Sequence, residues 1–481
     1  MNYISKKERN SFMTGLAGQN IVYCFIGASF FQYFLTDIAA FPAGVVGVLL
    51  MIMKIWDGVN DPIIGSMVDR RRFKNGEKLR PLLKYTPVPV GISTVLIFVV
   101  FSTDENLLWL RVGYFVIMYL CWDIAYTLQD VAIWGMTAVV SPDSDERDKF
   151  VQWARTIGSI FYGVFSAVIP MIMEMVAQKS GNSLALMTVL FAAIFGLGGA
   201  LVSAKCYKAQ ERVRLVKPEA QQTSIVECFK LLFSNKMLML VTLANLLGSL
   251  AFGNSLVTYF FKYKIPEISV AGMVLGPLTL TTIYGAITYA PSFIGMIFAD
   301  KFKHLFKGYK NVLIAIQIST IIGRVIAFFI GFEGINLLIG MIIMSVCSLL
   351  SGAASIAQTS LFCDSVDYME WKTGKRTEGV TFAMQTFFTK ISSGITGALA
   401  MFALSFMNYK EVADVPGAVY LGTQTQAFED WIWPLTMLTP AIAALLYIIP
   451  LLFIKYTPEQ KAQVEAEIKA RREKAEAEES F

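Results

Sequence analysis

Two aspartates stand one helical turn apart inside an otherwise apolar stretch of this sequence. Asp57 and Asp61 occur in KIWDGVNDPIIGSMV, which follows the run VVGVLLMIM, so the whole stretch is long enough to cross a bilayer as a helix. Residues four apart lie on one face of a helix, and both carboxylates therefore point the same way. Because an Asp at a bilayer centre costs about 2.5–3.5 kcal/mol to insert, this pair must face protein, water or an ion.

A second acidic pattern, CWDIAYTLQDVAIWGM, contains Asp123 and Asp130 seven residues apart on one face. Thr127 lies between them and Trp134 lies one turn beyond. We interpret Asp123 as a helix-packing residue. We interpret Asp130 as part of a site, because a hydroxyl precedes it by one turn and an indole follows it by one turn.

Carboxylates, hydroxyls and an amide such as that of Asn60 are hard oxygen donors, which suit an alkali cation or a titrating proton. One alternative is that Lys54 neutralises Asp57 and Asp61 in a purely structural triplet. Six scattered Cys without CxxC spacing and a single histidine, His304, argue against a transition-metal site.

Hydrogen-bond donors and amides occur on other predicted membrane helices. These residues are Gln19, Asn20, Arg155, Gln385, Thr386 and Lys390. We expect their side chains to pair across helices with the carboxylates or with the hydroxyl groups of a solute. The indole of Trp134 offers a flat face for a pyranose ring, although a membrane Trp more often serves packing or the interfacial belt.

The composition is that of an integral membrane protein. The chain has 481 residues, of which 55% are hydrophobic and 16% charged, and its mean hydropathy is +0.55. The net charge of +5 is concentrated in short basic blocks between apolar runs, so we expect no nucleic-acid partner. The first apolar run lacks a cleavage signature and is expected to remain as a membrane helix.

The hydropathy pattern predicts an all-α fold of twelve membrane helices in two groups of six. They are expected at Phe12–Thr36, Ala43–Val68, Leu82–Phe101, Leu107–Val139, Phe150–Val176, Ser183–Cys206, Met237–Phe261, Val270–Phe298, Val312–Ile330, Ile335–Phe362, Val380–Phe406 and Ile432–Phe453. The predicted domains are an N-terminal bundle (1–206), a central cytoplasmic loop (207–236), a C-terminal bundle (237–455) and a polar helical tail (456–481).

Lys and Arg cluster on alternate connections. TDIAAFPAG, STDENLL, QKSGNS and GFEGIN are nearly free of them, so both termini are predicted to be cytoplasmic, with the protein in the cell membrane. The external connection between Asn408 and Asp430 is long and mildly acidic. We expect it to be uninvolved in transport, and the alternative is that it covers the outer mouth.

A similar sequence motif occurs in both halves of the chain. IIGSMVDRRRFKNG follows the second predicted helix and FIGMIFADKFKHLFKG follows the eighth, and each joins a glycine to an aspartate and a basic run. The residues of this cytoplasmic motif, which would brace the halves against each other, are Gly65, Asp69, Arg70, Gly295 and Asp300. Such a repeat with parallel halves is typical of the major-facilitator arrangement, although any cytoplasmic loop would be basic.

Several blocks resemble one known family. WDGVNDPIIGSMVDR, GLAGQN, YTLQDVAIW, QWARTIGS, CDSVDYMEWKTGKRTEG and MQTFFTKISSG follow in family order, so the chain is identified as a member of the glycoside–pentoside–hexuronide:cation symporter family, the melibiose-carrier group of the major facilitator superfamily. The resemblance covers nearly the full length.

The resemblance implies the residues of two neighbouring sites. The implied cation ligands are Asp57, Asp61, Asp130 and Thr127, with Asn60 adjacent. The implied sugar contacts are Asn20, Asp130, Trp134, Arg155, Gln385, Thr386 and Lys390. Gln19-Asn20 replaces the Lys-Asp pair of the melibiose carrier, and SGAASIAQTSLF lacks its tryptophan, so another glycoside, pentoside or uronide is favoured as the substrate.

We therefore predict a non-enzymatic secondary symporter that acts as a monomer and needs no cofactor beyond the co-transported Na⁺ or H⁺. A primary pump would need a nucleotide site, and the sequence contains no GxxxxGK[ST] motif. An intramembrane enzyme would need a compact dyad rather than acids and amides spread over several helices. A carrier of a non-sugar solute such as a lysolipid is the remaining alternative.

Overall fold

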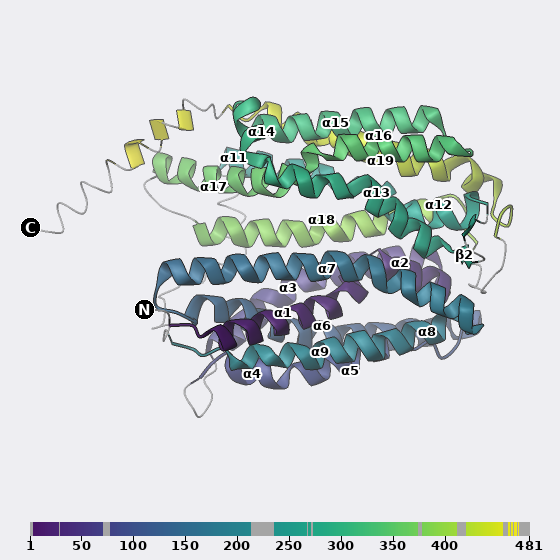
Figure 1. Cartoon of the computed structure of the whole chain (residues 1–481), viewed down its shortest axis with the longest axis horizontal. Coiled ribbons are helices and arrows are strands. Elements are labelled where there is room, and N and C mark those ends of the chain that lie inside the picture. The colour runs from purple at the N-terminus through teal and green to yellow at the C-terminus, as the bar shows by residue number, and fades with distance from the viewer. Residues whose placement is uncertain are drawn as a thin grey trace, which may run out of the picture. The chain divides into compact units, whose positions relative to one another are not determined.

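The computed structural model is almost entirely helical (Figure 1). It describes residues 3–470 except 28, 71–76, 213–234, 267, 271–272, 374–377, 411–419, 456–459, 462, 465 and 469. The α-helices are α1 (Lys6–Gly27), α2 (Phe30–Tyr33), α3 (Ala43–Arg70), α4 (Arg80–Tyr85), α5 (Pro87–Ile97), α6 (Leu108–Val139), α7 (Ser144–Ser180), α8 (Leu184–Phe191), α9 (Gly198–Ser203), α11 (Lys236–Gly248), α12 (Val257–Lys264), α13 (Pro277–Ile297), α14 (Ala299–Leu305), α15 (Tyr309–Ile330), α16 (Ile335–Ser348), α17 (Ala354–Thr373), α18 (Glu378–Phe406) and α19 (Gln426–Leu452).

Short stretches of tighter or wider helix join several of these. They are η1 (Phe34–Ile38), η2 (Glu105–Leu107), η3 (Ala192–Leu197), η4 (Ala204–Lys208), η5 (Phe252–Leu256) and η6 (Leu350–Ala353). Strands β1 (Ile268–Val270) and β2 (Met273–Leu275) pair antiparallel. The prediction of a helix from Val270 was therefore wrong at its start, since this hairpin precedes α13.

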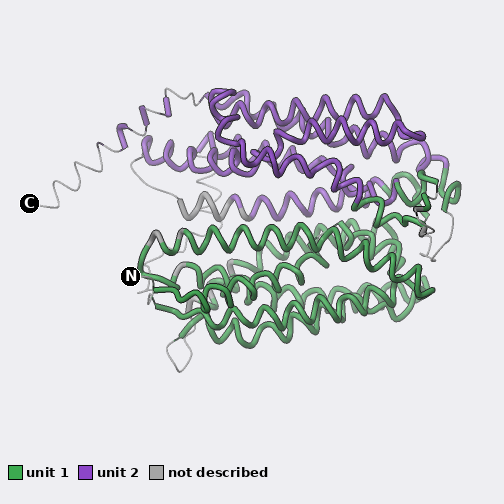
Figure 2. Tube along the Cα trace, in the orientation of Figure 1, with its two compact units in different colours: residues 1–219, 261–282, 404–425 green, residues 220–260, 283–403, 426–481 purple. Residues whose placement is uncertain are grey.

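Figure 2 shows two compact units. Unit 1 comprises residues 1–219, 261–282 and 404–425, and unit 2 comprises residues 220–260, 283–403 and 426–481. Unit 1 therefore contains two segments from the second half of the sequence. The predicted bundles, 1–206 and 237–455, stay a prediction.

Among the described residues, ten helices are long and apolar enough to cross a membrane, or eleven if one bent pair is a single span. That pair, Lys6–Gly27 with Phe30–Ile38, is bent by 47°. The shorter apolar helix Pro87–Ile97 falls where the third of the twelve predicted helices was expected, because the stretch is divided between α4 and α5. The fold is that of a multi-pass membrane protein.

Close helix packing holds each unit together. In unit 1, a Cβ atom on Gly18 of α1 would lie 2.5 Å from the carbonyl oxygen of Gly199 on α9, so only glycine permits this approach. In unit 2, α15 packs against α16 and α19, and Val312 and Leu313 are buried in its core.

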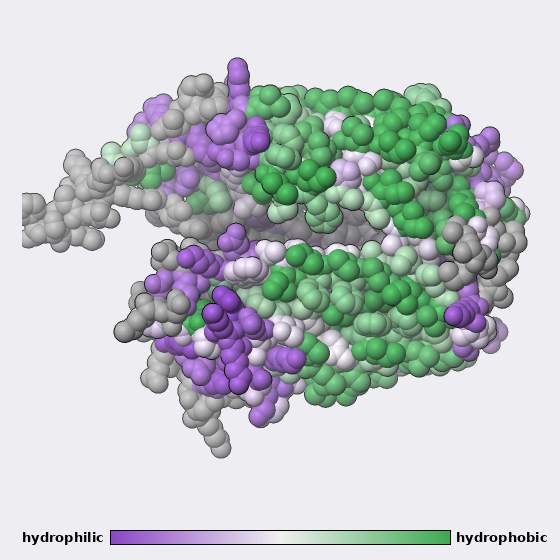
Figure 3. Space-filling view, in the orientation of Figure 1, coloured by the Kyte–Doolittle hydropathy of each residue, from purple (hydrophilic) through white to green (hydrophobic). Residues whose placement is uncertain are grey.

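Apolar side chains dominate the outer surface of both units. Figure 3 shows hydrophobic residues over the middle of the visible face of each unit, with hydrophilic residues gathered at the ends. Ile297 is 80% exposed, Phe329 79% and Trp109 75%. A water-soluble protein would bury such side chains, so these surfaces are suited to lipid.

Parts of the predicted regions lie outside the described residues. These are 213–234 of the central loop, 411–419 of the connection after α18, and most of the tail from 456 onward.

Candidate functional site

Asp57 lies inside unit 1, where α3 packs against α6. Its side chain forms an ion pair with Lys54 one turn earlier, with 2.6 Å between Oδ2 and Nζ. The hydroxyl of Tyr119 on α6 donates to the other carboxylate oxygen at 3.2 Å. Asp57 is 6% exposed. Lys54 is thus the internal counter-charge of one carboxylate in the predicted cation site.

Two further polar pairs join the same helices. Asn60 Nδ2 on α3 donates to Asp123 Oδ2 on α6 at 2.8 Å, and Thr127 Oγ1 donates to Asp61 Oδ1 at 3.4 Å. Asp123 also lies within electrostatic reach of Asp57 and Asp61. These hydrogen bonds between the facing sides of α3 and α6 bring the carboxylates of Asp57, Asp61 and Asp123 into one group.

Asp123, which the sequence analysis interpreted as a helix-packing residue, lies beside the two carboxylates of α3. It is 4% exposed and belongs to the acidic cluster, which we define as Asp57, Asp61 and Asp123 with Lys54, Asn60, Tyr119 and Thr127. The sequence analysis placed Asp123 on the same helix face as Asp130, but the spacing along one helix did not show that this face meets α3.

Asp130 lies one turn beyond Thr127 on α6 and accepts a hydrogen bond from Gln19 Nε2 of α1 at 2.7 Å. Gln19 is almost fully buried. Its neighbour Asn20, which the resemblance assigns to the sugar site, instead donates to the carbonyl oxygen of Leu16. The residue of the Gln19-Asn20 pair that contacts the predicted site is thus Gln19.

Oxygen ligands of two kinds are available to a cation here. Among the described residues, no three of the His, Cys, Asp and Glu side chains are close enough to hold a metal ion by themselves. A small cation bound in the acidic cluster would therefore need neutral oxygens as well as carboxylates, and Thr127 and Asn60 provide them. Alkali cations bind to hard oxygen ligands, and a mixture of carboxylate and neutral oxygens suits them.

Trp134 and Arg155 form a second feature of unit 1. The guanidinium carbon of Arg155 on α7 lies 4.9 Å from the centre of the Trp134 ring on α6. This stacking holds an aromatic face and a cationic donor together. Both were predicted as sugar contacts, and the structure brings these two side by side.

The remaining predicted sugar contacts lie in unit 2. Gln385, Thr386 and Lys390 all belong to α18, and the side chain of Thr386 lies outside the described residues. Gln385 and Lys390 are half-buried.

The predicted cytoplasmic motif differs between its two copies. Gly65 of α3 has open space where a Cβ would lie, whereas a Cβ on Gly295 of α13 would collide with the carbonyl oxygen of Leu349. Asp300 lies in the first turn of α14. Asp69 and Arg70 are the last residues of α3, and their side chains are outside the described set.

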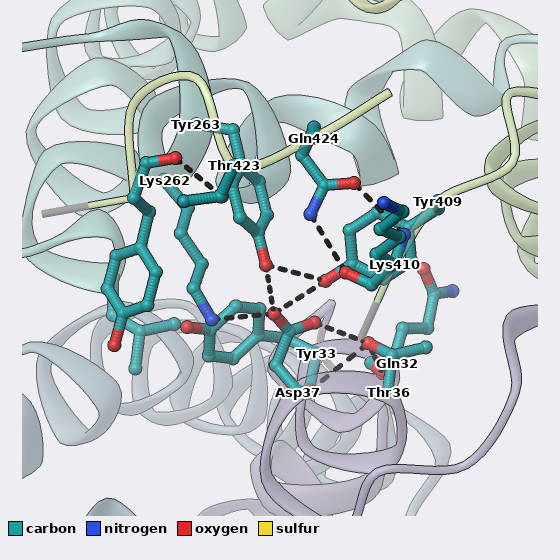
Figure 4. Close-up of polar contacts among 12 residues, drawn as sticks. Gln32, Tyr33, Thr36, Asp37, Lys262, Tyr263, Tyr409, Lys410, Thr423 and Gln424 are labelled. Atoms are coloured by element: carbon teal, nitrogen blue, oxygen red, sulfur yellow. Dashed lines mark hydrogen bonds and ion pairs between the residues drawn. The ribbon is translucent and has the colours of Figure 1, made fainter. Parts of the chain in front are cut away.

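A fully buried ion pair joins the end of η1 to α12 within unit 1 (Figure 4). Asp37 Oδ1 accepts from Lys262 Nζ at 2.7 Å, from the hydroxyl of Tyr409 at 2.7 Å and from that of Tyr263 at 3.2 Å. Thr36 donates to Oδ2 at 2.7 Å. Both charged side chains are 0% exposed.

Aromatic rings enclose the ammonium group of this pair. Lys262 Nζ lies 4.5 Å from the ring centre of Tyr420, and 5.3 Å from those of Tyr33 and Tyr263. We call Asp37, Lys262, Tyr263, Tyr409 and Tyr420 the Asp37 cluster. Sequence reasoning missed it, although a lysine at the end of a helix on the predicted Lys-poor side was a usable signal.

A second buried acid fastens the start of α13 to α7. Glu174 accepts from the backbone N–H of Leu278 at 3.0 Å, from that of Thr279 at 2.8 Å and from the Thr279 hydroxyl at 2.6 Å. Glu174 is 4% exposed. A carboxylate at a helix N-terminus is favourably placed, because it satisfies free N–H groups and complements the helix dipole.

The fold is shared with a solved membrane transporter. The nucleoside transporter NupG superposes with a TM-score of 0.60 at 14% sequence identity, covering 94% of this chain and 100% of that one. Together with the apolar spans, this likeness defines a multi-pass membrane protein of the major facilitator fold.

The chain belongs to the family described as MFS/sugar transport protein, whose model matches residues 11–458. A symporter of Bacillus subtilis, YjmB, whose name marks it as uncharacterized, is 26% identical over 96% of this chain and 95% of its own length. The lactose permease of Leuconostoc lactis is 27% identical over 75% of this chain and 56% of the permease. Membership confirms the family resemblance found in the sequence.

Proposed function

We propose that the protein is a secondary active symporter that imports a sugar or glycoside together with Na⁺ or H⁺. The observation that carries the proposal is the acidic cluster on α3 and α6, two helices long and apolar enough to span a membrane. Asp57 and Asp123 are almost fully buried there. Buried anions in a spanning helix are costly unless a cation compensates them, and a bound Na⁺ or proton would do so.

The cation is assigned to Asp57, Asp61, Asp123, Thr127 and Asn60, with Asp130 one turn further along α6. In its absence Lys54 compensates Asp57 through their ion pair. Cation binding competes with that pair and can release Lys54. Protonation of one carboxylate would have the same electrostatic effect, so the cluster suits either coupling ion.

The sugar is assigned to the region of Asp130, Trp134 and Arg155, with Gln385, Thr386, Lys390 and Asn20 as further contacts. The stacked Trp134 and Arg155 offer an apolar face and charged donors, which is the combination that a hydroxyl-rich ring needs. Asp130 is shared by the two assignments. The name of the Leuconostoc relative, lactose permease, supports a sugar as the substrate.

Coupling of sugar transport to the cation follows from the thermodynamic linkage between the two binding equilibria. If the cation stabilises the conformation that binds the sugar, then the sugar raises the affinity for the cation by the same factor. The doubly loaded carrier then changes between outward-open and inward-open states.

The Asp37 cluster and Glu174 are assigned to closure of the external end. Both fasten segments of residues 261–282 to helices from the first half of the chain. The predicted orientation, with both termini in the cytoplasm, supports assigning this end to the outside of the cell. Opening to the outside would separate Asp37 from Lys262 and admit water to both charges.

Uptake by proteoliposomes tests this function. The purified protein is given a panel of radiolabelled glycosides, pentosides and uronides under an imposed Na⁺ gradient or an imposed proton gradient, one at a time. The proposal predicts accumulation of at least one sugar above equilibrium with one gradient only, and its collapse on adding the matching ionophore. Uptake that only equilibrates with every sugar and both gradients would contradict it.

A further inference from the structure

A group of lysines lies at the end of unit 2 where α13 is followed by α14 and α15 (Figure 1). Neither the proposed cation site nor the proposed sugar site uses it. Figure 3 shows hydrophilic residues over this end of unit 2, and the predicted orientation makes it the cytoplasmic end. We call the group the Lys301 patch; it consists of Lys301 and Lys303 of α14, Lys307 of the following turn, Lys310 of α15 and Lys455 just beyond α19.

The patch directly follows the ends of two apolar spans. The spans of α13 and α19 end at Ile297 and Leu452. Large apolar side chains are left on the surface beside the lysines: Leu305 is 70% exposed, Leu452 64% and Phe453 61%. Exposed side chains of this size are suited to the acyl chains of lipids. A lipid whose acyl chains pack on them would have its headgroup beside the lysines.

Side-chain contacts bring the lysines of separate segments together. Lys310 Nζ donates to the backbone carbonyl oxygen of Ile454 at 2.9 Å, which joins the start of α15 to the end of α19. Lys455 is the next residue after Ile454. Lys303 Nζ lies 5.1 Å from the ring centre of Tyr309, so α14 is held against the start of α15. The basic side chains of three segments are thus gathered at one place.

The positive charge of the patch is not balanced by carboxylates. Asp300 is the one acidic residue of α14 and of the turn that follows it. In the part of the chain that the structure describes, none of the five lysines forms an ion pair, with Asp300 or with any other acid. The cytoplasmic end of unit 1 differs, because Arg212 is paired there with Glu8 at 2.7 Å. The patch therefore remains available to an external anion.

We propose that the Lys301 patch binds the headgroup of an anionic phospholipid in the cytoplasmic leaflet. Each lysine near the membrane surface adds to the attraction for an anionic lipid. Lys301 Nζ lies 4.9 Å from the ring centre of Phe298, so its stem follows apolar surface while its charge stays at headgroup level. A phospholipid matches both the lysines and the exposed apolar side chains, whereas a soluble phosphate matches only the lysines.

Native mass spectrometry of the purified full-length protein tests the proposal. The protein in detergent is titrated with dioleoylphosphatidylglycerol or dioleoylphosphatidylcholine, which share their acyl chains and differ in headgroup charge. The wild type should bind the first phosphatidylglycerol at least about tenfold more tightly than the first phosphatidylcholine, because several lysines contribute to the attraction. Glycerol 1-phosphate at the same concentration should not displace the bound lipid, because it lacks acyl chains.

Two triple variants locate the binding. The patch variant combines Lys301→Gln, Lys303→Gln and Lys307→Gln. The matched control removes the same charge from exposed residues near the start of unit 1 and combines Lys6→Gln, Lys7→Gln and Arg9→Gln. The patch variant should lower the preference for phosphatidylglycerol to about twofold or less. The control variant, and a patch variant with arginine at the same three positions, should keep the preference of the wild type.

The melting temperature in phosphatidylcholine shows whether the patch variant is folded, since neutral lipid does not engage the lysines. If it does not fold, Lys455→Gln carries the test, with an expected loss of up to about fivefold in affinity for phosphatidylglycerol. Equal binding of the two lipids by the wild type, an equal loss in the patch and control variants, unchanged binding in Lys455→Gln, or displacement of the lipid by glycerol 1-phosphate would each overturn the proposal.

Discussion

The ammonium group of Lys262 donates to the carboxylate of Asp37 at 2.7 Å, and neither side chain has any exposed surface. The two residues are separated by 225 positions in the chain. An ion pair that is removed from water is held by mutual attraction and by its other hydrogen bonds, here from two tyrosines and a threonine. Such a pair is stable while it is dry and weak once water enters.

Asp37→Asn should destabilise the protein, because it leaves Lys262 buried without an anion. Breaking a buried pair from one side costs about 3–5 kcal/mol, so we expect a clear drop in melting temperature and loss of most sugar uptake. Lys262→Gln should act in the same direction. Thermal unfolding in detergent and uptake by proteoliposomes measure the two effects.

The matched control is Asp104→Asn. Asp104 is exposed and caps the short turn η2, so its loss should cost about 1 kcal/mol or less. The exchanged pair Asp37→Lys with Lys262→Asp should recover part of the lost stability. Wild-type melting and uptake in both single variants would show that the pair does not hold this end closed.

Glu174→Gln should loosen the start of α13. The carboxamide keeps one acceptor oxygen, but it turns an NH₂ group toward the N–H groups of Leu278 and Thr279. An unsatisfied buried group of this kind costs about 1–3 kcal/mol. Hydrogen exchange of peptides covering residues 275–282 should accelerate, while the exposed-site variant Glu105→Gln leaves it unchanged. Unaltered exchange in Glu174→Gln would refute the fastening role.

The two glycines of the repeated motif should respond differently to alanine. Gly295→Ala places a methyl group against the carbonyl oxygen of Leu349 and should lower the melting temperature by several degrees. Gly65→Ala enters open space and should be neutral or stabilising by up to about 1 kcal/mol, since alanine is the better helix former. Equal effects at both sites would contradict this difference in packing.

Hydropathy was sufficient to predict most of the helices, because the cost of placing polar backbone in lipid forces long apolar stretches into helical form. It did not predict the hairpin Ile268–Leu275 or the break at η5. Both depend on local backbone preference and on neighbours that lie far away in the sequence.

Asp57 and Asp61 of α3, and Asp130 of α6, were recognised as candidate site residues because of their spacing to other polar residues on the same helix face, whereas Asp123 on that face was interpreted as a packing residue. Which groups they contact was not predictable in the same way. Asn60 of α3 donates a hydrogen bond to Asp123 on α6. Gln19, rather than Asn20, donates a hydrogen bond to Asp130. These pairs depend on how each helix is rotated about its axis relative to its neighbour. That rotation cannot be derived from a single sequence. The Asp37 cluster escaped prediction for the same reason.

Sugar accumulation in proteoliposomes containing Asp61→Asn tests the central claim most directly. Asp61 belongs to the acidic cluster and accepts from Thr127, whereas Asp430 is exposed and serves as the matched control Asp430→Asn. Under the cation gradient that drives the wild type, Asp430→Asn should accumulate sugar normally. Asp61→Asn should lose at least about nine-tenths of the accumulation, because its site lacks one of the charges that attract the cation. Wild-type accumulation by Asp61→Asn would contradict the assignment of the cation to this cluster.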